Sequence, residues 1–352
     1  MSGKILLVTL CSVNNYGNVL QHYALTKKLE DMGFEVHHHF GASGYKMPPE
    51  KDVRKIAREE RFKNYQDKFT LKKIFLTFGE TVNADKSMWD EYDFAVTGSD
   101  QVWHNWFRIA EELEFFYLEF VEREKRVCYA PSFGFSHFAD YDRELHKKGL
   151  EGFERLSCRE QEMQPMIRAL TGQEAELVLD PTLLLEAEQW QEVSSKPEYD
   201  LPERYVLCYF LGEITPEYSR AISDMAGGLP VVNIYDIFSK NADKNSPYYT
   251  THPGEFLYLF EHADFVCTDS FHGTAFSVIF RKNFLSFRRE QDNVKDMFGR
   301  IESLLSNLGL MNHVLNPGMT ARPDALNNEA VTSRLDEMRG SSLKYLRECL
   351  KA

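Results

Sequence analysis

The chain is 352 residues long, and its 41 Lys and Arg against 54 Asp and Glu give a formal net charge of −13. Hydrophobic residues form 43 % of the sequence and aromatic residues 13 %, which supplies apolar material for two domain-sized cores and argues against intrinsic disorder. The acidic balance argues against a nucleic-acid partner, because phosphate-backbone binding needs a basic face. It leaves room for a small anionic ligand, which needs only a few well-placed cations.

Cysteine spacing and hydropathy predict where the protein works. The six cysteines lie singly in the sequence, with neither a CxxC pair nor a zinc-type spacing. No apolar stretch reaches the roughly 18–20 residues that a membrane span needs. We therefore expect reduced thiols, no metal, no transmembrane segment and a cytoplasmic location, with peripheral contact at the inner face of the membrane as the closest approach to lipid.

The N-terminal half alternates apolar runs with helical patterns. An apolar run at 4–10 is followed by a polar loop at 11–18, a helical pattern that ends near Gly33, and a second apolar run at 34–40. This order is typical of a doubly wound sheet. Residues 41–88 are rich in Lys, Arg, Glu and Phe at helical spacing, and we interpret them as an inserted helical segment. Further strands are predicted at 94–103, 126–134, 153–161 and 175–185.

The same pattern returns after a polar stretch with two prolines at 194–204, which is the best candidate for a linker. Strands are predicted at 205–213, 229–236, 264–273 and 283–289, and helices at 216–226, 253–261 and 274–280. We predict a domain at 1–190, a second at 191–327 and a C-terminal helix at 328–352 that can pack back on the first domain. Apolar runs that end in polar residues are typical of parallel strands whose carboxyl ends face a ligand cleft.

The densest group of chemistry-bearing residues follows the apolar part of the strand predicted at 264–273. Ser270 and His272 come there, and Gly273-Thr274 opens the next helix. Backbone N–H groups at a helix start bind anions, and an imidazole beside them can exchange a proton near neutral pH. We expect an anion site with His272 as its acid–base group. The alternative is that the polar residues are helix caps and that the histidine packs.

Two other predicted strand ends carry charged residues. Ser99 and Asp100 follow the run FAVTG, with Trp103 three residues later. A carboxylate beside an indole can orient a sugar hydroxyl, although a turn with a helix cap also explains the glycine and serine. Arg159 ends the run LSC, where its planar guanidinium suits a carboxylate or phosphate; a surface ion pair with Glu160 is the alternative.

The loop at 11–18 enters the first helix and carries Asn14, Asn15, Gly17 and Asn18. It is similar to a phosphate or sugar loop without matching a known phosphate-binding motif, and helix capping explains it equally well. Ser132, in the run YAPSFG, either lines the cleft or turns the chain.

Several other residues have structural interpretations beside functional ones. Asp180-Pro181 is interpreted as a turn or helix cap. Among the three consecutive histidines only His37 and His39 share a face of a strand, so a solvated strand edge is preferred over a metal site. Trp103, Trp106 and Phe107 either stack on sugars or belong to the core. Arg288 and Arg289 follow the last strand of the second half and are candidate auxiliary cations.

Taken in order, these motifs resemble the polysaccharide pyruvyl transferase family. The matching stretches extend from residue 14 to about 310 and are NNYGNVLQHYAL, FAVTGSDQVW, YAPSFG, LSCREQ, LVLDPTLLL, PGEFLYLFEHADFVCTDSFHGTAFSVIF and RIESLLSNLGL. The resemblance implies a fold similar to GT-B glycosyltransferases, with two Rossmann-like domains whose parallel sheets face a central cleft. It implies transfer of pyruvate from phosphoenolpyruvate, as a cyclic ketal, onto a sugar of a surface polysaccharide (an exopolysaccharide or capsule) or its lipid-linked precursor, with no further cofactor.

The resemblance also assigns roles to residues. The family's donor contacts match Arg159 and His272, which puts the donor phosphate on the 191–327 side and the acceptor on the 1–190 side. Some family members carry a basic residue two positions before the histidine, where this chain has Ser270. A second donor cation is then expected from Arg288, Arg289 or Arg300. The family's usual arginine after the late leucine-rich helix is replaced near His313.

These assignments give a predicted site. His272 protonates the donor methylene, and Asp100 orients or deprotonates an acceptor hydroxyl. The donor is expected at Arg159, Ser270, Gly273, Thr274 and Arg288. The acceptor is expected at Asn14, Asn15, Gly17, Asn18, Ser99, Trp103 and Ser132. Two alternatives stay open: a GT-B-type glycosyltransferase that uses a nucleotide-sugar donor, and a non-catalytic family member that binds glycans.

Overall fold

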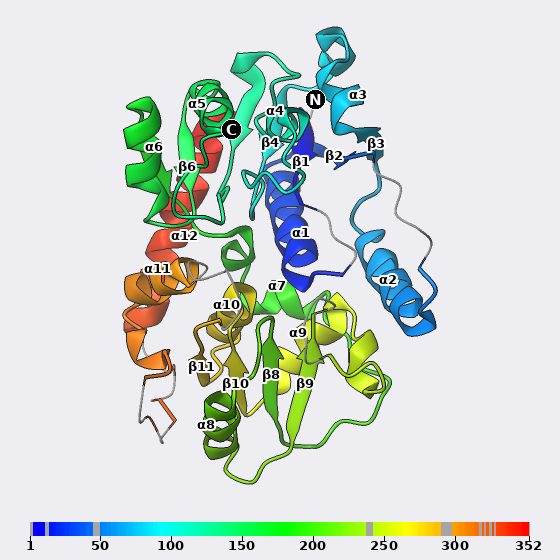
Figure 1. Ribbon diagram of the computed structural model, residues 1–352, viewed down its shortest axis with the longest axis vertical. Helices are drawn as coiled ribbons and strands as arrows, with labels where there is room; N and C mark the ends of the chain where they lie inside the picture. The colour runs from blue at the N-terminus through cyan, green and yellow to red at the C-terminus, as the bar shows by residue number, and fades with distance from the viewer. Residues whose placement is uncertain are drawn as a thin grey trace.

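Two parallel β-sheets with flanking helices build the molecule (Figure 1). The computed structural model describes residues 3–10, 14–44, 50–236, 242–289, 298–316, 319, 322–323, 326 and 329–351. The first sheet contains β1 (Lys4–Val8), β2 (Glu35–Ala42), β3 (Lys73–Thr77), β4 (Phe94–Thr97) and β5 (Arg126–Cys128). Their order is β3-β2-β1-β4-β5, with every pair parallel. β1 lies in the middle, and its apolar residues are buried on both faces.

The helices of this half are α1 (Tyr16–Asp31), α2 (Val53–Gln66), α3 (Phe78–Val82), α4 (Ala110–Phe116) and α5 (Arg143–Glu151). Asn15 caps α1, because its side chain accepts a hydrogen bond from the backbone N–H of Asn18. The helix therefore begins inside the polar loop predicted at 11–18, so that Gly17 and Asn18 lie in its first turn, and it enters the space between the two sheets (Figure 1).

The segment 41–88 is not only helical, as the sequence indicated. β3 lies within it and pairs in register with β2, with the rings of Phe40 and Phe75 stacked at 5.2 Å between centroids. β2 is thereby an inner strand, so its His38 and His39 are buried and the expected solvated edge is wrong. A short apolar run is compatible with either a helix or a strand, and here pairing with β2 at the edge of the sheet makes it a strand.

β6 (Leu156–Cys158) and β7 (Ala175–Leu177), with α6 (Met163–Thr171), form a separate two-stranded sheet. The sequence placed these strands with the preceding ones, but the ladder stops at β5. Ser157 bridges the gap with its side chain: its hydroxyl donates to the carbonyl of Cys128 (3.0 Å) and accepts from the amide of Ala130 (3.1 Å). The carboxyl end of β6 therefore stays close to those of the first sheet.

The second sheet contains β8 (Val206–Phe210), β9 (Val231–Tyr235), β10 (Phe265–Thr268) and β11 (Phe284–Ser286) in the order β11-β10-β8-β9. Its helices are α8 (Pro216–Ala226), α9 (Pro253–His262) and α10 (Phe271–Ile279), with a 3₁₀ turn at Pro247–Thr250 before α9. α10 begins three residues earlier than predicted, because Ser270 is its N-cap and accepts from the amide of Gly273 (3.3 Å).

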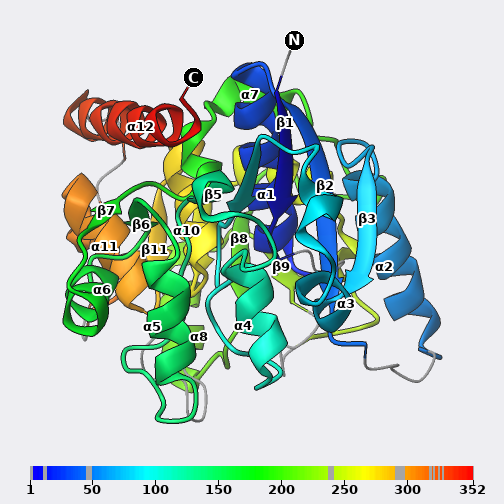
Figure 2. The same cartoon turned by 90° about the horizontal axis from the view of Figure 1, so that it is seen from above.

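The chain passes between the halves more than once. A 3₁₀ helix, η3 (Pro181–Leu184), and α7 (Ala187–Gln191) lead to the second sheet, and α11 (Gly299–Leu308) leads back toward α12 (Glu329–Leu350). α12 packs on the N-terminal half, where the Tyr345 hydroxyl donates to the Cys128 carbonyl (3.1 Å) and Arg339 Nε to the Leu183 carbonyl (2.7 Å). Both views show α12 beside the first half of the chain (Figures 1 and 2).

Contacts at the start of α1 join the two halves directly. The Tyr16 ring stacks on Phe256 of α9 at 4.4 Å between centroids, and its hydroxyl donates to the Thr251 carbonyl (2.9 Å).

Within the described part of the chain, no helix is both long and apolar enough to cross a membrane. The five cysteines placed there are free thiols, and Cys11 lies outside the described residues.

Candidate functional site

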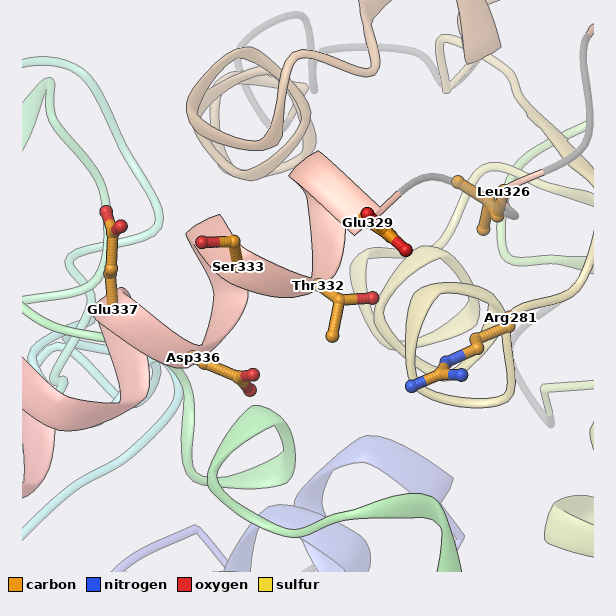
Figure 3. Close-up of a pocket in the computed structure, with 7 residues that line it drawn as sticks. All are labelled: Arg281, Leu326, Glu329, Thr332, Ser333, Asp336 and Glu337. Carbon is orange, nitrogen blue, oxygen red and sulfur yellow. The ribbon is translucent and has the colours of Figure 1, made fainter.

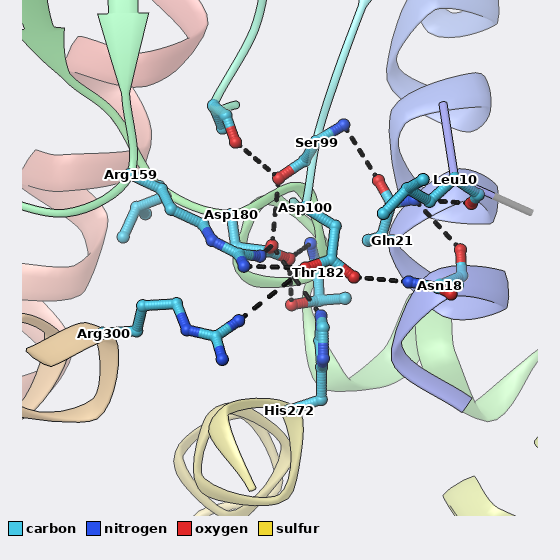
Figure 4. Close-up of polar contacts among 12 residues, drawn as sticks. Leu10, Asn18, Gln21, Ser99, Asp100, Arg159, Asp180, Thr182, His272 and Arg300 are labelled. Carbon is cyan, nitrogen blue, oxygen red and sulfur yellow. Dashed lines mark hydrogen bonds and ion pairs between the residues drawn. The ribbon is translucent and has the colours of Figure 1, made fainter. Parts of the chain in front are cut away.

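Charged side chains that follow β4, β6, β7 and β10 meet in one cluster (Figure 4). Arg159 is at its centre, with a side chain only 1 % exposed. Its Nη1 donates to Asp180 (2.7 Å), its Nη2 to Asp100 (2.8 Å) and its Nε to Glu160 (3.2 Å). The expected alternative of a surface pair with Glu160 is wrong, because the guanidinium is buried. We call Asp100, Arg159, Asp180, His272 and Arg300 the Arg159 cluster.

Asp100 is held by both its backbone and its side chain. Its φ of +68° is in the left-handed region, and its carbonyl accepts from the amides of Val102 (2.8 Å) and Ser132 (2.9 Å). Asn18 donates to the second carboxylate oxygen (2.5 Å). Burial raises the pKa of Asp100, but the positive charge of Arg159, with smaller contributions from His272 and Arg300, outweighs it and holds that pKa below its usual value. Asp100 is therefore ionised.

Asp180 combines a structural and an electrostatic role. It caps η3, as predicted, by accepting from the amide (3.0 Å) and hydroxyl (2.7 Å) of Thr182. Its other oxygen accepts from Ser99 Oγ (3.1 Å) and lies 3.8 Å from His272 Nε2. Burial raises the pKa of Asp180, but hydrogen bonds and the charges of His272 and Arg159 hold it far below its usual range. The sequence prediction left this residue out of the site.

His272 lies between the two halves of the chain. It is the second residue of α10, and the first turn of α1, which carries Gly17, lies against its Nδ1. A Cβ on Gly17 would lie 2.0 Å from His272 Nδ1, so only glycine allows this approach. The structure thus brings Gly17 and Asn18 of the N-terminal half to the same site as His272 of the C-terminal half.

Arg300, on the first turn of α11, reaches the cluster from another direction (Figure 4). Its Nη1 lies 3.8 Å from Asp100. Burial and the nearby Arg159 lower the pKa of Arg300 to about 10, although Asp100 and Glu160 oppose this. Arg289, after β11, has its Nε 3.7 Å from Asp269.

The residues predicted around the start of α10 have packing roles. Ser270 is the N-cap, and Gly273 packs against Thr268, whose hydroxyl would be 2.3 Å from an added Cβ. Thr274 is fully buried, and its hydroxyl pairs with Ser286 of β11 (2.8 Å). None of these three contacts concerns a ligand, and their proposed donor contacts stay predictions.

Other predicted residues lie away from the cluster or inside the core. Trp103 is completely buried and stacks on Tyr117, which is the core position that the sequence left open rather than a sugar contact. Ser132 is buried in a turn, where its hydroxyl accepts from the Gly134 amide. Arg288 is exposed and its guanidinium lies over the Phe298 ring. His313 is buried against Phe284.

The remaining polar residues of the loop before α1 have separate tasks. Asn14 donates to Glu59 of α2 (2.9 Å), and Asn15 caps α1. Trp106 and Phe107, which follow the Asp100 loop, are 48 % and 54 % exposed and so are not core residues. Their exposure keeps the possibility of sugar stacking open.

A cavity of about 840 Å³ lies apart from the cluster, between α12 and the end of α10 (Figure 3). It is lined by Arg281, Leu326, Glu329, Thr332, Ser333, Asp336 and Glu337. This lining has three acids and one base and includes none of the cluster residues, so we do not regard it as the active site. Among the described residues, no group of three or more His, Cys, Asp and Glu side chains is arranged to hold a metal ion.

Comparisons with known proteins give the same fold and a family. A family profile described as "Polysaccharide pyruvyl transferase" matches residues 15–291. A crystal structure of a putative UDP-N-acetylglucosamine 2-epimerase from Listeria monocytogenes superposes with a TM-score of 0.53 at 11 % identity, covering 98 % of this chain and 90 % of that one. This likeness shows a GT-B-type fold.

Other solved structures are more distant. An Anabaena protein solved with UDP and glucose has a TM-score of 0.48 at 13 % identity, covering 98 % of this chain and 95 % of its own. The glycosyltransferase SnogD from Streptomyces nogalater has a TM-score of 0.39 at 12 % identity, covering 100 % and 95 %. Among curated proteins, none matches the sequence.

Proposed function

Because the chain belongs to the polysaccharide pyruvyl transferase family, we propose that it moves the pyruvyl group of phosphoenolpyruvate onto two hydroxyls of a sugar, as a cyclic ketal. The sugar belongs to a surface polysaccharide or its lipid-linked precursor, and the protein meets it in the cytoplasm, at the inner face of the membrane when the acceptor is lipid-linked. The observation that carries the proposal is a buried histidine 3.8 Å from an ionised carboxylate, in a cluster with two guanidiniums.

The reaction balances with one acid–base group. His272 gives a proton to the donor methylene, which becomes the methyl group, and the first sugar hydroxyl attacks C2. The second hydroxyl then displaces phosphate and closes the ketal. One hydroxyl proton returns to His272 and the other leaves with the phosphate, so no further cofactor is needed. General acid–base help of this kind is typically worth about 10²–10⁴ in rate.

Asp100 is better suited to orient the acceptor than to deprotonate it. Its two oxygens already accept from Arg159 and Asn18, and its pKa lies below the usual value because Arg159, with His272 and Arg300, outweighs its burial. A carboxylate this well compensated is a weak base. Its fixed position after β4 supports a role in holding one hydroxyl of the acceptor.

The closed site has a consequence for substrate entry. The side chains of the Arg159 cluster are at most 11 % exposed. The first turn of α1 covers the imidazole at Gly17. A sugar and a donor therefore reach these side chains only if the start of α1 and the start of α10 move apart. Entry therefore couples movement of the N-terminal half to access to the C-terminal half.

One contact in the second half disfavours the nucleotide-sugar alternative. In an open α/β sheet, backbone amides after a strand are the groups that hold a diphosphate. Here the amides of Leu211 and Gly212, just after β8, donate to Asp269 at 2.7 and 2.8 Å. Because a carboxylate already occupies them, they are not free for a diphosphate, which supports a smaller donor.

Phosphate release tests the proposal. The protein is incubated with phosphoenolpyruvate and a panel of galactose, mannose and N-acetylhexosamine acceptors. We expect acceptor-dependent release, reduced about 10²–10⁴-fold by His272→Ala. His262→Ala, at the exposed end of α9, is the matched control and should keep full activity. Near-normal turnover by His272→Ala would refute the acid–base assignment. If none of the acceptors in the panel causes phosphate release, the transfer reaction is refuted for these sugars.

A binding experiment separates the candidate donors. A ligand that binds the folded state raises its melting temperature. We expect phosphoenolpyruvate to raise the Tm and UDP-sugars to leave it unchanged. The reverse pattern would favour the glycosyltransferase, and acceptor-dependent phosphate release would exclude a non-catalytic glycan-binding protein.

A further inference from the structure

Arg159 and Arg300 are both buried in the cluster, but their hydrogen bonding differs. Every nitrogen of the Arg159 guanidinium donates to a carboxylate. The Nη1 of Arg300 is 3.8 Å from Asp100, beyond hydrogen-bond distance. Its Nε has no hydrogen-bond partner among the described residues, although its side chain is only 11 % exposed. A buried guanidinium in this state is costly, and an anion that accepts from it would remove the cost.

Asp100 does not serve as the hydrogen-bonded counter-ion of Arg300. One of its oxygens accepts from Arg159 and the other from Asn18. The carboxylate is therefore satisfied without Arg300, and only the unscreened attraction between opposite charges remains at 3.8 Å. The Arg300 donors stay available to a ligand.

The fold holds Arg300 at this place through contacts of α11 with the segment after β6. Gly299 is pressed against Glu162, whose carboxylate would be 2.4 Å from an added Cβ. Gln161 bonds twice to the same helix, to Ser303 (3.4 Å) and Asn307 (3.0 Å). Arg159, two residues before Gln161, and Arg300 are thus fixed relative to one another by the same contacts.

We propose that Arg300 binds the phosphate group of the donor, and that Arg159 is a positioning residue that holds Asp100 and Asp180 in place. This inference rests on the proposed function for the identity of the donor. Arg300 and His272 reach the two carboxylates from α11 and α10 (Figure 4). A phosphate on Arg300 would lie beside the first turn of α10, whose amides and dipole favour negative charge.

The local charge balance predicts a large effect when Arg300 is removed. Asp100, Asp180 and Glu160 all face Arg159. Without Arg300, these three carboxylates face the single guanidinium of Arg159, and their excess negative charge repels an anion. Arg300→Gln should therefore weaken phosphate binding by at least about 10- to 100-fold, the range of a lost charge-assisted hydrogen bond.

Calorimetric titration with inorganic phosphate tests the inference without requiring turnover. We expect the wild-type protein to bind phosphate, Arg300→Gln to lose it, and Arg300→Lys to retain part of it, because lysine keeps the charge but not the planar fork. Arg281→Gln removes the same charge at the opposite end of α10 and should bind like wild type. The melting temperature of each variant reports folding, and Arg300→Lys serves if Arg300→Gln does not fold.

The outcomes separate this inference from the proposed function. Loss of phosphate binding in Arg300→Gln without any pyruvyl transfer by the wild type supports the anion site and refutes the reaction. If the enzyme is active, a raised KM for phosphoenolpyruvate with a folded Arg300→Gln supports both. Phosphate binding that is unchanged in Arg300→Gln, or absent in the wild type, overturns the role of Arg300. Loss of phosphate binding in an Arg159→Gln protein that is still folded at the assay temperature, with the Arg300→Gln protein still binding, overturns the positioning role of Arg159.

Discussion

Two fully buried arginines join segments of this chain, and their surroundings differ. Arg58 of α2 donates to the carbonyls of Tyr249 (2.6 Å) and Asn14 (3.4 Å) and lies over the rings of Tyr16, Phe62 and Tyr249. Arg159 donates to three carboxylates and adjoins a histidine. Carbonyls and rings hold a guanidinium without titrating, so the Arg58 region joins the two halves structurally. Several ionisable groups packed together, with strongly shifted pKa values, are typical of a site that handles charge.

Removal of the Arg159 side chain should have the largest effect on stability. Arg159→Gln leaves Asp100 and Asp180 buried without the guanidinium that donates to both. We expect the free energy of unfolding at pH 7 to fall by about 3–5 kcal/mol, as for a broken buried ion pair. Urea unfolding measures this. Arg155→Gln, which breaks two exposed ion pairs nearby, should cost less than about 1 kcal/mol, and an equal loss in the two variants would contradict the comparison.

The pH dependence of that loss has a defined sign. The folded-state pKa values of Asp100 and Asp180 lie below the unfolded ones, because the charge of Arg159 and its neighbours outweighs burial. Their contribution is full above the unfolded value of about 4 and disappears as the pH falls through the lower folded values. The stability gap between wild type and Arg159→Gln should therefore be constant from pH 6 to 8 and shrink below about pH 4.

Arg58 should behave differently in both respects. Arg58→Gln leaves two backbone carbonyls with poorer partners and removes the packing of the guanidinium on three rings. We expect a loss of about 2–3 kcal/mol in the free energy of unfolding. The titratable group that interacts with Arg58 is the Tyr16 hydroxyl, whose pKa burial raises to about 12, so this loss should be the same at pH 4 and pH 8. If the stability difference between wild type and Arg58→Gln becomes smaller in acid, the Arg58 region depends on pH as the Arg159 cluster does, and the comparison fails.

The part of the site that sequence could predict is the part that follows from parallel strands. Asp100, Arg159 and His272 each come after a short apolar run, and the carboxyl ends of such strands meet. The sequence could not show that Arg159 is saturated, because Asp180, its nearest partner, also fits a simple helix cap. The sequence offered Arg300 only as one of three candidate donor cations. It could not select among them, because the position of Arg300 depends on how α11 packs against Glu162.

The misassigned residues show where local pattern fails. Trp103 follows a polar loop, and nothing in its neighbours signals that it is completely buried against Tyr117. β3 is five residues long, and its Ile and Phe fit either a helix or a strand. In both places the position of a neighbouring element, not the intrinsic preference of the residues, decides the structure.

Gly17→Ala tests whether the cluster is a site as well as an anchor. The added Cβ would lie 2.0 Å from His272 Nδ1, so the imidazole or the first turn of α1 must move. A displacement of about 1 Å at a reacting group costs about 10²-fold in rate, and we expect a fall in kcat of that size with little change in the melting temperature. Gly340→Ala, on α12 with open space around its Cβ position, should leave kcat unchanged. Unaltered kcat in Gly17→Ala would mean that His272 is not held by this contact.

Glu112 contrasts with the carboxylates of the Arg159 cluster, because it is buried with no ion pair to it among the described residues. Glu112 of α4 is 1 % exposed and accepts from the Phe107 amide (2.7 Å), and burial raises its pKa to about 7. The unfolded chain loses this proton near pH 4.5 and the folded chain near pH 7, so stability declines as the pH rises between those values. Glu112→Gln should remove the decline and raise the free energy of unfolding at pH 8 by about 1–2 kcal/mol. Urea unfolding at pH 5 and pH 8 measures it, with Glu111→Gln on the same turn as control. If stability still declines between pH 5 and pH 8 in Glu112→Gln, the decline belongs to other groups, and burial of Glu112 is not its cause.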